Sequence, residues 1–166
     1  MTRIGVLSDS HINAPSPWFC DQVEQAFHDC SVILHAGDLT DISILEVFAG
    51  KELHAVHGNM CNHSAHKSLP TDTMIRIDGY SIGLCHGAGN RYNIEDRMWD
   101  LFPTADCIVY GHTHMAVNHC HGKTLFLNPG SFSNTGRYGA PGSYAILTTT
   151  PEGLQASLHL LDENHR

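Results

Sequence analysis

Ile4-Gly5-Val6-Leu7-Ser8-Asp9-Ser10-His11 is the stretch of sequence that says most about the fold. It is a short apolar run that gives way to polar residues, a pattern typical of a strand that is buried on both faces. The strand is followed by Asp9 and His11, whose side chains are of the types that bind divalent metal ions. This stretch therefore predicts a buried strand with candidate metal ligands at its carboxyl end.

Four further places repeat the pattern of an apolar run that ends in a metal-binding type of side chain next to glycine: Gly37-Asp38, Gly58-Asn59, His86-Gly87 and Gly111-His112-Thr113-His114. Open α/β sheets bind their ligands at the carboxyl ends of their strands, so we expect these side chains to converge there. Small neighbours let the backbone approach a metal closely. In an extended segment, residues two apart point the same way, so we expect Asp9 with His11, and His112 with His114, to act as pairs.

The ligand types narrow the choice of ion. Two aspartates, one asparagine and four histidines, without a thiolate, suit Mn, Fe, Ni or Zn, and we expect Mn²⁺ first. A structural zinc site would more often use cysteines at short spacing. Seven side chains are enough for two divalent ions.

Apolar runs and turn residues predict the secondary structure. The expected strands are 4–8, 31–35, 53–57, 74–77, 82–86, 107–110, 116–120, 124–127, 144–149 and 154–161. The expected helices are 17–29, 42–49 and 93–101. Alternating strands and helices predict parallel βαβ units through about residue 60, and the strand-rich second half is expected to be largely antiparallel. A long loop from Asn128 to Ser143 is expected to border the site.

Composition limits the classes of function. With 166 residues the chain fits a single domain, residues 1–166. It has 9 Lys and Arg against 17 Asp and Glu, so no basic stripe is available for nucleic acid. No apolar run is long enough for a membrane span or a signal peptide, which predicts a cytoplasmic protein. The six cysteines lack a C-x-x-C pairing and are expected to be reduced and mostly buried.

The five blocks, in the order D-x-H, G-D, G-N, a lone His near Gly, and G-H-x-H, resemble the calcineurin-like metallophosphoesterases. The form His35-Ala36-Gly37-Asp38 and the turn Asn128-Pro129-Gly130-Ser131 are most similar to the small prokaryotic phosphodiesterase branch. The resemblance implies an α/β fold, a two-sheet αββα sandwich. A single block would be weak evidence, but five in order are specific.

The resemblance also implies the site residues. One ion would be bound by Asp9, His11, Asp38 and His114, and the other by Asp38, Asn59, His86 and His112. Asp38 would bridge the ions, and Asp9, Asp38 and Asn59 would belong to the catalytic machinery. A hydroxide held between two divalent ions would then attack a phosphoester without a covalent enzyme intermediate.

The chain departs from the family at Met60. Many members carry a histidine after the asparagine of G-N that helps to protonate the leaving group, and methionine cannot donate a proton. Either esters with good leaving groups are favoured, or His57, His63 or His66 acts instead. His35 and His57, each just before a ligand, are expected to support ligands or the core rather than to coordinate.

The expected substrate is a small phosphoester, more often a diester than a monoester. The main alternative is a non-catalytic, metal-binding protein-interaction scaffold, because the resemblance includes a retromer protein that has the same fold and an altered ligand position. A nuclease of short oligonucleotides is a third hypothesis. Arg137 is a candidate phosphate contact, and apolar residues near Trp18, Phe19 and Trp99 are a weak indication of a homo-oligomer.

Overall fold

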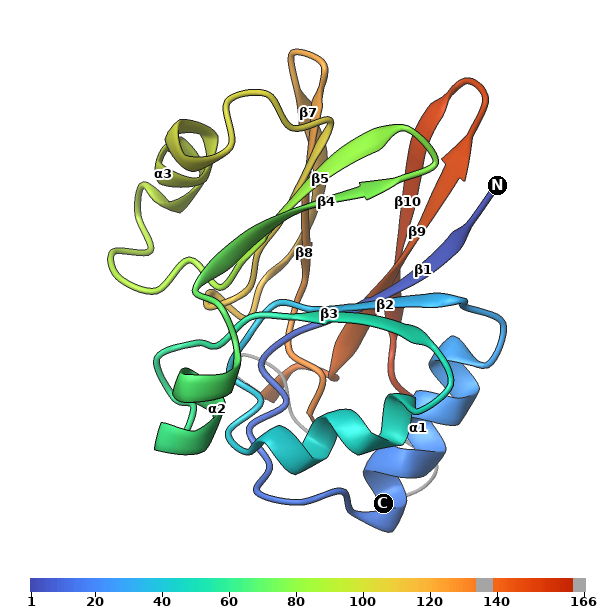
Figure 1. The fold of residues 1–166 in the computed structure, drawn as a ribbon, viewed down its shortest axis with the longest axis vertical. Coiled ribbons are helices and arrows are strands. Elements are labelled where there is room, and N and C mark those ends of the chain that lie inside the picture. The colour runs from blue at the N-terminus through green and yellow to red at the C-terminus, as the bar shows by residue number, and fades with distance from the viewer. Residues whose placement is uncertain (134–138, 163–166) are drawn as a thin grey trace.

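The protein is a sandwich of two five-stranded sheets with helices on the outer faces (Figure 1). The computed structural model describes residues 1–133 and 139–162. Each sheet has one face against the other sheet and one face against a helical layer. The expected αββα arrangement is therefore confirmed.

The first sheet has the strand order β10-β9-β1-β2-β3. Its strands are β1 (Arg3–Leu7), β2 (Val32–His35), β3 (Glu52–Ala55), β9 (Ser143–Thr150) and β10 (Gly153–Leu160). β1, β2 and β3 are parallel, and β9 and β10 add to the β1 side as an antiparallel pair. The predicted parallel units of the first 60 residues are thus confirmed, and their carboxyl ends share one edge.

The second sheet has the order β4-β5-β6-β8-β7. Its strands are β4 (Asp72–Ile77), β5 (Tyr80–Cys85), β6 (Cys107–Val109), β7 (Ala116–His121) and β8 (Thr124–Pro129). The outer pairs are antiparallel hairpins, but β5, β6 and β8 are parallel. The expectation of a largely antiparallel second half is therefore wrong for the centre of this sheet. Helix α3 (Ile94–Leu101) provides the crossover that a parallel β5–β6 pair requires.

Capping side chains fix where the other helices begin. Helix α1 (Pro17–Phe27) starts after Ser16, whose Oγ accepts a hydrogen bond from the Phe19 backbone N–H, and it carries proline at its first position. The segment expected as a helix over 42–49 is a 3₁₀ helix, η1 (Ile42–Phe48). A short helix that the apolar pattern did not predict, α2 (His63–Ser68), is capped by Asn62.

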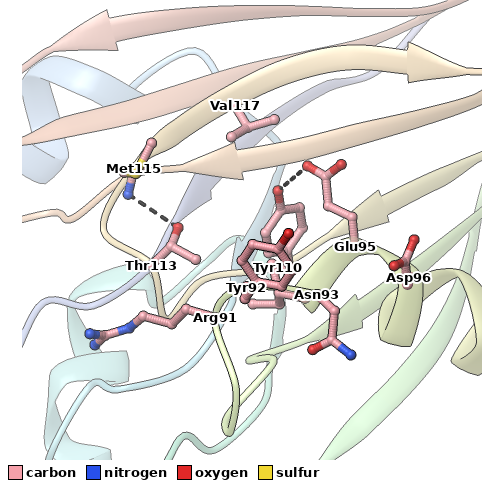
Figure 2. A pocket seen from close by; sticks show the side chains of 10 residues that line it. Arg91, Tyr92, Asn93, Glu95, Asp96, Tyr110, Thr113, Met115 and Val117 are labelled. Carbon is pink, nitrogen blue, oxygen red and sulfur yellow. Dashed lines mark hydrogen bonds between the residues drawn. The ribbon is translucent and has the colours of Figure 1, made fainter.

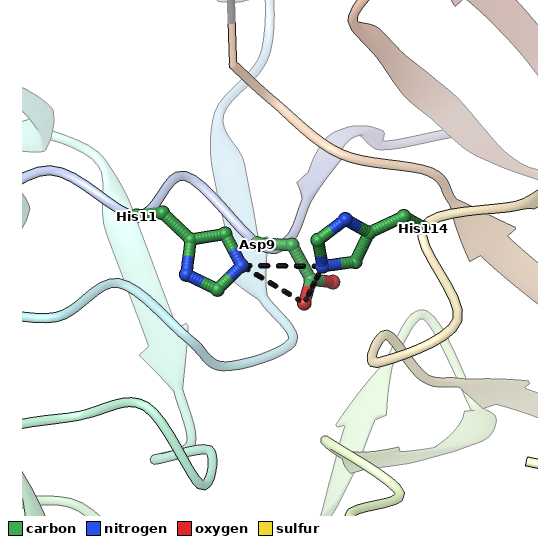
Figure 3. Close-up of side chains that lie close together, drawn as sticks. All are labelled: Asp9, His11 and His114. Atoms are coloured by element: carbon green, nitrogen blue, oxygen red, sulfur yellow. Dashed lines mark hydrogen bonds and ion pairs between the residues drawn. The ribbon is translucent and has the colours of Figure 1, made fainter. Parts of the chain in front are cut away.

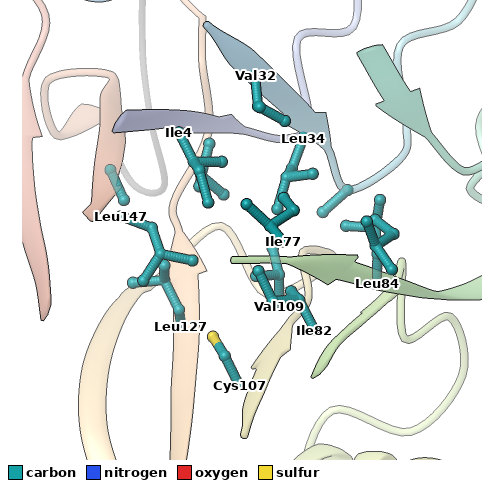
Figure 4. Packing of buried hydrophobic residues seen from close by; sticks show 14 of the residues in the cluster. Ile4, Val32, Leu34, Ile77, Ile82, Leu84, Cys107, Val109, Leu127 and Leu147 are labelled. Atoms are coloured by element: carbon teal, nitrogen blue, oxygen red, sulfur yellow. The ribbon is translucent and has the colours of Figure 1, made fainter. Parts of the chain in front are cut away.

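Three apolar layers hold the sandwich together. The central one lies between the sheets and includes Ile4, Leu34, Val109, Leu127 and Leu147, all with no exposed surface (Figure 4). A second layer packs the first sheet against α1 and η1, and a third packs the second sheet against α3. The two sheets are therefore held rigidly against each other, and with them the loops at their common edge.

The aromatic residues considered for a subunit contact are covered wholly or in part. Phe19 is fully buried and Trp18 and Trp99 pack partly against the outer layers, so these residues do not form an exposed apolar patch. Three of the six cysteines are buried, while Cys20 and Cys120 are exposed, because they lie on the outer sides of α1 and of an edge strand.

Within the described residues no helix combines the length and the apolar character that a membrane span needs.

Candidate metal centre

The five sequence blocks meet at one edge of the sandwich, as expected. Each block follows the carboxyl end of a strand: β1, β2 and β3 in the first sheet, and β5 and β6 in the second. Asp9, Asp38 and His86 are buried, His112 is nearly so, and His11 and His114 are partly exposed. The cluster therefore has a buried floor and an open side.

Asp9 has one carboxylate oxygen that is fully engaged and one that is not. Oδ2 accepts hydrogen bonds from Ser8 Oγ at 2.6 Å and from the His112 backbone N–H at 3.0 Å. Oδ1 is buried and has no hydrogen-bond partner within the described residues. It lies 3.1 Å from His114 Nε2 and 3.7 Å from His11 Nε2 (Figure 3). One oxygen thus anchors the side chain, and the other faces the histidines.

The two carboxylate oxygens of Asp38 also have different surroundings. Its Oδ1 accepts a hydrogen bond from the Met60 backbone N–H at 2.7 Å. Its Oδ2 lies 3.1 Å from His86 Nε2 and 4.0 Å from His11 Nε2. The Oδ2 atom therefore lies between the histidine of the first block and that of the fourth, which is where a bridging ligand would have to be.

Hydrogen bonds to backbone carbonyls orient two of the histidines. His86 Nδ1 lies 2.8 Å from the Ala36 carbonyl and must donate to it, which leaves Nε2 directed at Asp38. His112 Nε2 lies 3.0 Å from the Gly89 carbonyl and must also donate, which leaves Nδ1 as its available ligand atom. Such contacts fix the tautomer and orientation of metal-binding histidines in proteins.

The backbone around the ligands is unusual. Among the described residues, seven other than glycine have positive φ, and five of these are candidate ligands: Asp9, His11, Asp38, His112 and His114. The expectation that the D-x-H and H-x-H pairs are extended is therefore wrong. Left-handed turns send His114 toward His11 and His112 toward His86, with ring centroids 5.1 and 5.2 Å apart. Such conformations are costly and concentrate at functional sites.

Two glycines next to the ligands are required by lack of space. A Cβ on Gly58 would collide with Asp38 Oδ1, and a Cβ on Gly111 would collide with Ser8 Oγ and approach Asp9 Oδ2 to 2.7 Å. The small neighbours expected from the sequence therefore allow the backbone to pack directly on both carboxylates.

The carboxylates and histidines shift one another's pKa values. Burial raises the pKa of Asp9, but the adjacent His11 and His114 outweigh it and hold this pKa well below its usual range. Burial likewise opposes ionisation of Asp38, and His86 lowers its pKa overall. The pKa of His86 is lowered by burial and raised more strongly by Asp38 and Asp9. The site thus holds two buried negative charges that require positive charge beside them.

This arrangement fits divalent metal ions. Two overlapping groups of ligand atoms lie within 4.8 Å of one another: Asp9, His11 and His114, and Asp9, Asp38 and His86. Ligand atoms around one ion with bonds of 2.0–2.2 Å are separated by about 3.4 Å. The His11 and His114 Nε2 atoms are 3.2 Å apart and each faces Asp9 Oδ1. The unpartnered Oδ1 of Asp9 and Nε2 of His86 are the atoms that an ion would satisfy.

The third block, Gly58-Asn59, lies at the rim. Asn59 is exposed and borders a hollow of about 350 Å³, which we call the His66 hollow. His57, His66 and His86 also line it. His57 is close to Thr71 Oγ1, at 3.1 Å, and its ring centroid is 4.2 Å from that of His66. His63, at the exposed start of α2, is not among the residues that line this hollow.

Met60 enters the site through its backbone only. Its N–H binds Asp38, whereas its side chain is 59% exposed. The Met60 side chain therefore offers no proton to a leaving group.

Several supporting residues were not singled out from the sequence. Ser131 Oγ donates to the Asp9 carbonyl at 2.8 Å, and Asn128 Nδ2 donates to the Gly111 carbonyl at 2.9 Å. Arg97 donates to the carbonyls of the loop after His86: Gly87, Ala88 and Asn90. A polar residue at the end of a buried strand was the available signal for Asn128. The described part of the long loop borders the site through Ser131.

His35 has the supporting position expected for it. It has no exposed surface, its Nδ1 accepts a hydrogen bond from the Gly37 N–H, and its Nε2 lies 3.2 Å from Ser10 Oγ. The ring thus links the D-x-H loop to the G-D loop. Arg137, the candidate phosphate contact, lies outside the described residues.

Comparisons with known proteins find sequences similar to most of this chain. The profile of the Calcineurin-like phosphoesterase superfamily domain matches residues 2–152. A probable metallophosphoesterase of Methanothermobacter thermautotrophicus is 35% identical over 133 residues, 77% of this chain and 76% of that protein. One from Methanocaldococcus jannaschii is 32% identical over 77% of this chain and 67% of its own length.

Solved structures match the fold closely. Vps29 of Entamoeba histolytica superposes with a TM-score of 0.70 at 21% identity, covering 96% of this chain and 99% of that one. A structure described as a novel archaeal phosphodiesterase gives a TM-score of 0.70 at 18% identity, covering 95% and 99%. At these identities the likeness concerns the fold alone.

Proposed function

We propose that this chain, which belongs to the calcineurin-like phosphoesterase superfamily, hydrolyses small phosphodiesters with the help of two divalent ions, Mn²⁺ first among them. The family itself supports phosphoesterase activity and the use of divalent metals. The choice of diesters, of two ions and of manganese is our proposal.

One observation carries the proposal. Asp9 and Asp38 each have one oxygen saturated by internal donors, while the other oxygen faces histidine nitrogens across 3.1 Å. A purely structural carboxylate would use both oxygens in hydrogen bonds, because a buried acceptor without a partner is costly. In each carboxylate, one oxygen is held by hydrogen bonds and the other faces histidine nitrogens, and this difference supports a role in binding cations.

The residues divide into two sets around Asp38. We assign His11, His114 and Asp9 to one ion and His86, His112 and Asn59 to the other, with Asp38 between them. When bound, such ions would lower the pKa of a water molecule and offset the charge that develops on phosphoryl oxygens. Ser8, the His112 N–H and the Met60 N–H hold the carboxylates in place for this task.

Two hollows beside the centre support a diester rather than a monoester. The His66 hollow lies on the α2 side. A second hollow of about 370 Å³, which we call the Tyr92 hollow, is lined by residues of the loop before α3 and of the segment that follows His112, among them Arg91, Tyr92, Thr113 and Met115. A diester carries two organic groups on one phosphorus, and each hollow could take one. The match to an archaeal phosphodiesterase supports the same choice.

The His66 hollow also supplies the candidate proton donors. His57 and His66 both line it, whereas His63 is not among its lining residues. We therefore propose that the leaving group lies in this hollow and takes its proton from His57 or His66, in place of the histidine that Met60 replaces.

Turnover of bis(4-nitrophenyl) phosphate with added Mn²⁺ tests the function. We expect metal-dependent release of 4-nitrophenol, absent after chelation and absent in Asp9→Asn. Asp100→Asn, an exposed carboxylate on α3, is the matched control and should behave as the wild type. Wild-type protein that binds Mn²⁺ but shows no turnover of any diester would contradict the proposal.

A protein-interaction scaffold is the second candidate, because the fold is also that of Vps29. The scaffold hypothesis does not require unpartnered ligand atoms or two hollows beside them. A folded protein that shows no metal-dependent turnover of any phosphoester would favour it.

A further inference from the structure

Two loops that carry or support the metal ligands also contribute to the lining of the Tyr92 hollow. Thr113, which lines it, stands between His112 and His114 in the chain. Arg91, at its rim, follows the Gly89 carbonyl that fixes the His112 ring. Its volume of about 370 Å³ falls in the range of small-molecule sites. A group attached to a phosphate at the centre could therefore extend into it.

One side of the hollow is apolar and uncovered. Tyr92 is 97% exposed and Met115 is 52% exposed, and Val117 lies further along the same strand (Figure 2). An aromatic ring that covers nothing and lines a cavity offers a face for stacking, and a methionine beside it adapts to flat ligands. This side fits a planar aromatic group.

The other side of the Tyr92 hollow carries the carboxylates of Glu95 and Asp96, which are hydrogen-bond acceptors. Glu95 accepts a hydrogen bond from the buried Tyr110 hydroxyl at 2.6 Å (Figure 2). Glu95 also lies 3.0 Å from His119 Nε2. Asp96 is adjacent on the same wall. Two carboxylates repel an anionic group, and they bind one that carries amino or hydroxyl donors. This side excludes a second phosphate and fits the donors of a nucleoside.

Charge orients the ligand. Arg91 is the cation at the rim, and it stands two residues after Gly89, whose carbonyl lies 3.0 Å from His112 Nε2. The end near the centre is therefore suited to phosphate, and the far end to uncharged donors.

We propose that the Tyr92 hollow binds the nucleoside of a nucleotidyl phosphodiester, with the base on Tyr92 and its amino or ribose hydroxyl groups on Glu95 and Asp96. This inference rests on the proposed function. Because the candidate proton donors line the other hollow, the nucleoside is the group that stays on phosphorus. Water adds to phosphorus, the P–O bond to the leaving group breaks, and the products are a nucleoside monophosphate and an alcohol that has taken up a proton.

Two esters with the same leaving group test the inference: adenosine 5′-(4-nitrophenyl) phosphate and methyl 4-nitrophenyl phosphate. We expect the wild type to prefer the adenosine ester at least tenfold in kcat/KM, and Tyr92→Ala to reduce that preference about tenfold, as loss of a stacked base would. Arg76→Ala, an exposed cation on β4, is the matched control and should keep the preference.

Binding of adenosine alone gives a second readout that needs neither metal nor turnover. Calorimetric titration of the chelator-treated protein should show adenosine binding that is about tenfold weaker in Tyr92→Ala than in the wild type or in Arg76→Ala. Equal turnover of both esters, or a preference that Tyr92→Ala leaves intact, would overturn the inference while the phosphodiesterase function stands. If neither ester is hydrolysed, the proposed function fails, and adenosine binding decides the inference: Tyr92-dependent binding supports it, and no binding overturns it.

Discussion

His86 Nε2 lies 3.1 Å from Asp38 Oδ2, and within residues 1–133 and 139–162 this nitrogen has no hydrogen-bond partner. The other nitrogen of the ring donates to the Ala36 carbonyl, so the ring is locked with its lone pair toward a carboxylate. Two acceptors face each other across a gap that only a proton or a cation can fill. The negative charge of Asp38 is therefore the feature on which binding of a cation here depends.

Asp38→Asn should abolish tight metal binding. The amide keeps the shape of the side chain and can still accept from Met60, but it removes the charge shared between His86 and His11. We expect Mn²⁺ affinity, measured by titration calorimetry, to fall by roughly 100-fold or more, because even outer partners of ligands are worth 10–100-fold. Asp100→Asn is the control. Equal affinity in Asp38→Asn and the wild type would remove Asp38 from the site.

Metal should stabilise the fold by mass action. At a free Mn²⁺ concentration 100 times Kd, the gain in unfolding free energy is about 2.7 kcal/mol, which for a chain of this length corresponds to a rise in Tm of roughly 5–10 °C. Excess EDTA should reverse the rise, and Asp38→Asn should lack it. A Tm that does not respond to Mn²⁺, Fe²⁺, Ni²⁺ or Zn²⁺ would contradict the two-ion proposal.

Much of this site was predictable, because a strand followed by a ligand type is a local signal. Six of the seven candidate ligands from the five blocks lie close together, and the parallel order of β1, β2 and β3 placed three blocks at one edge. The seventh, Asn59, is exposed at the rim. The backbone conformation was not predictable in this way. Nothing in Asp9-Ser10-His11 alone indicates positive φ at both ligands, since that conformation is imposed by the opposing loops.

The second sheet shows a different limit. Its strands were recognised from their apolar runs, but their pairing depends on which strands a crossover joins. The hairpin strand β7 adds outside β8, so that β6 and β8 become parallel neighbours although β7 stands between them in the sequence. Helix α2 was missed because its six residues carry a single buried side chain, Ala65, and so show no apolar period.

Gly58→Ala should damage the metal centre more than the fold. Its Cβ would meet Asp38 Oδ1 and, at 2.6 Å, the Asp38 backbone nitrogen, so the carboxylate has to move. Gly83→Ala is the matched control, because its Cβ would approach the Phe102 ring to 2.5 Å in the core below α3. We expect both variants to lose roughly 1–3 kcal/mol in urea unfolding. Only Gly58→Ala should also lose Mn²⁺ affinity, and equal affinity in both variants would refute the close packing of Gly58 on the ligand.

Replacement of His57 or His66 by glutamine should make the reaction sensitive to the leaving group. A proton donor matters for alkoxide leaving groups and little for 4-nitrophenolate, and general-acid catalysis contributes about 100-fold or more. At least one of the two variants should therefore lose roughly that factor in kcat/KM on a diester whose leaving group is methoxide. The same variant should change far less on the ester whose leaving group is 4-nitrophenolate. His63→Gln, on the exposed start of α2, is the control. If both variants affect the two esters equally, these histidines do not protonate the leaving group.

His35 should make the metal-free protein less stable as the pH falls. Burial lowers the pKa of this histidine to about 4, from about 6.5 in the unfolded chain. Above pH 6.5 the ring is neutral in both states. As the pH falls from 6.5 toward 4, the unfolded chain takes up a proton that the folded protein does not, so the free energy of unfolding decreases. Between pH 7.5 and pH 5 this loss amounts to about 2 kcal/mol.

The measurement is urea unfolding in excess EDTA at pH 7.5 and pH 5, for the wild type and for His35→Asn. Asparagine can still accept from the Gly37 N–H but does not titrate, so the variant should be less stable than the wild type at pH 7.5 and should lose about 2 kcal/mol less between the two pH values. His28→Asn, an exposed histidine at the end of α1, should keep the wild-type pH dependence. If His35→Asn keeps it as well, the acid sensitivity of the fold comes from the ligand cluster rather than from the ring that supports it.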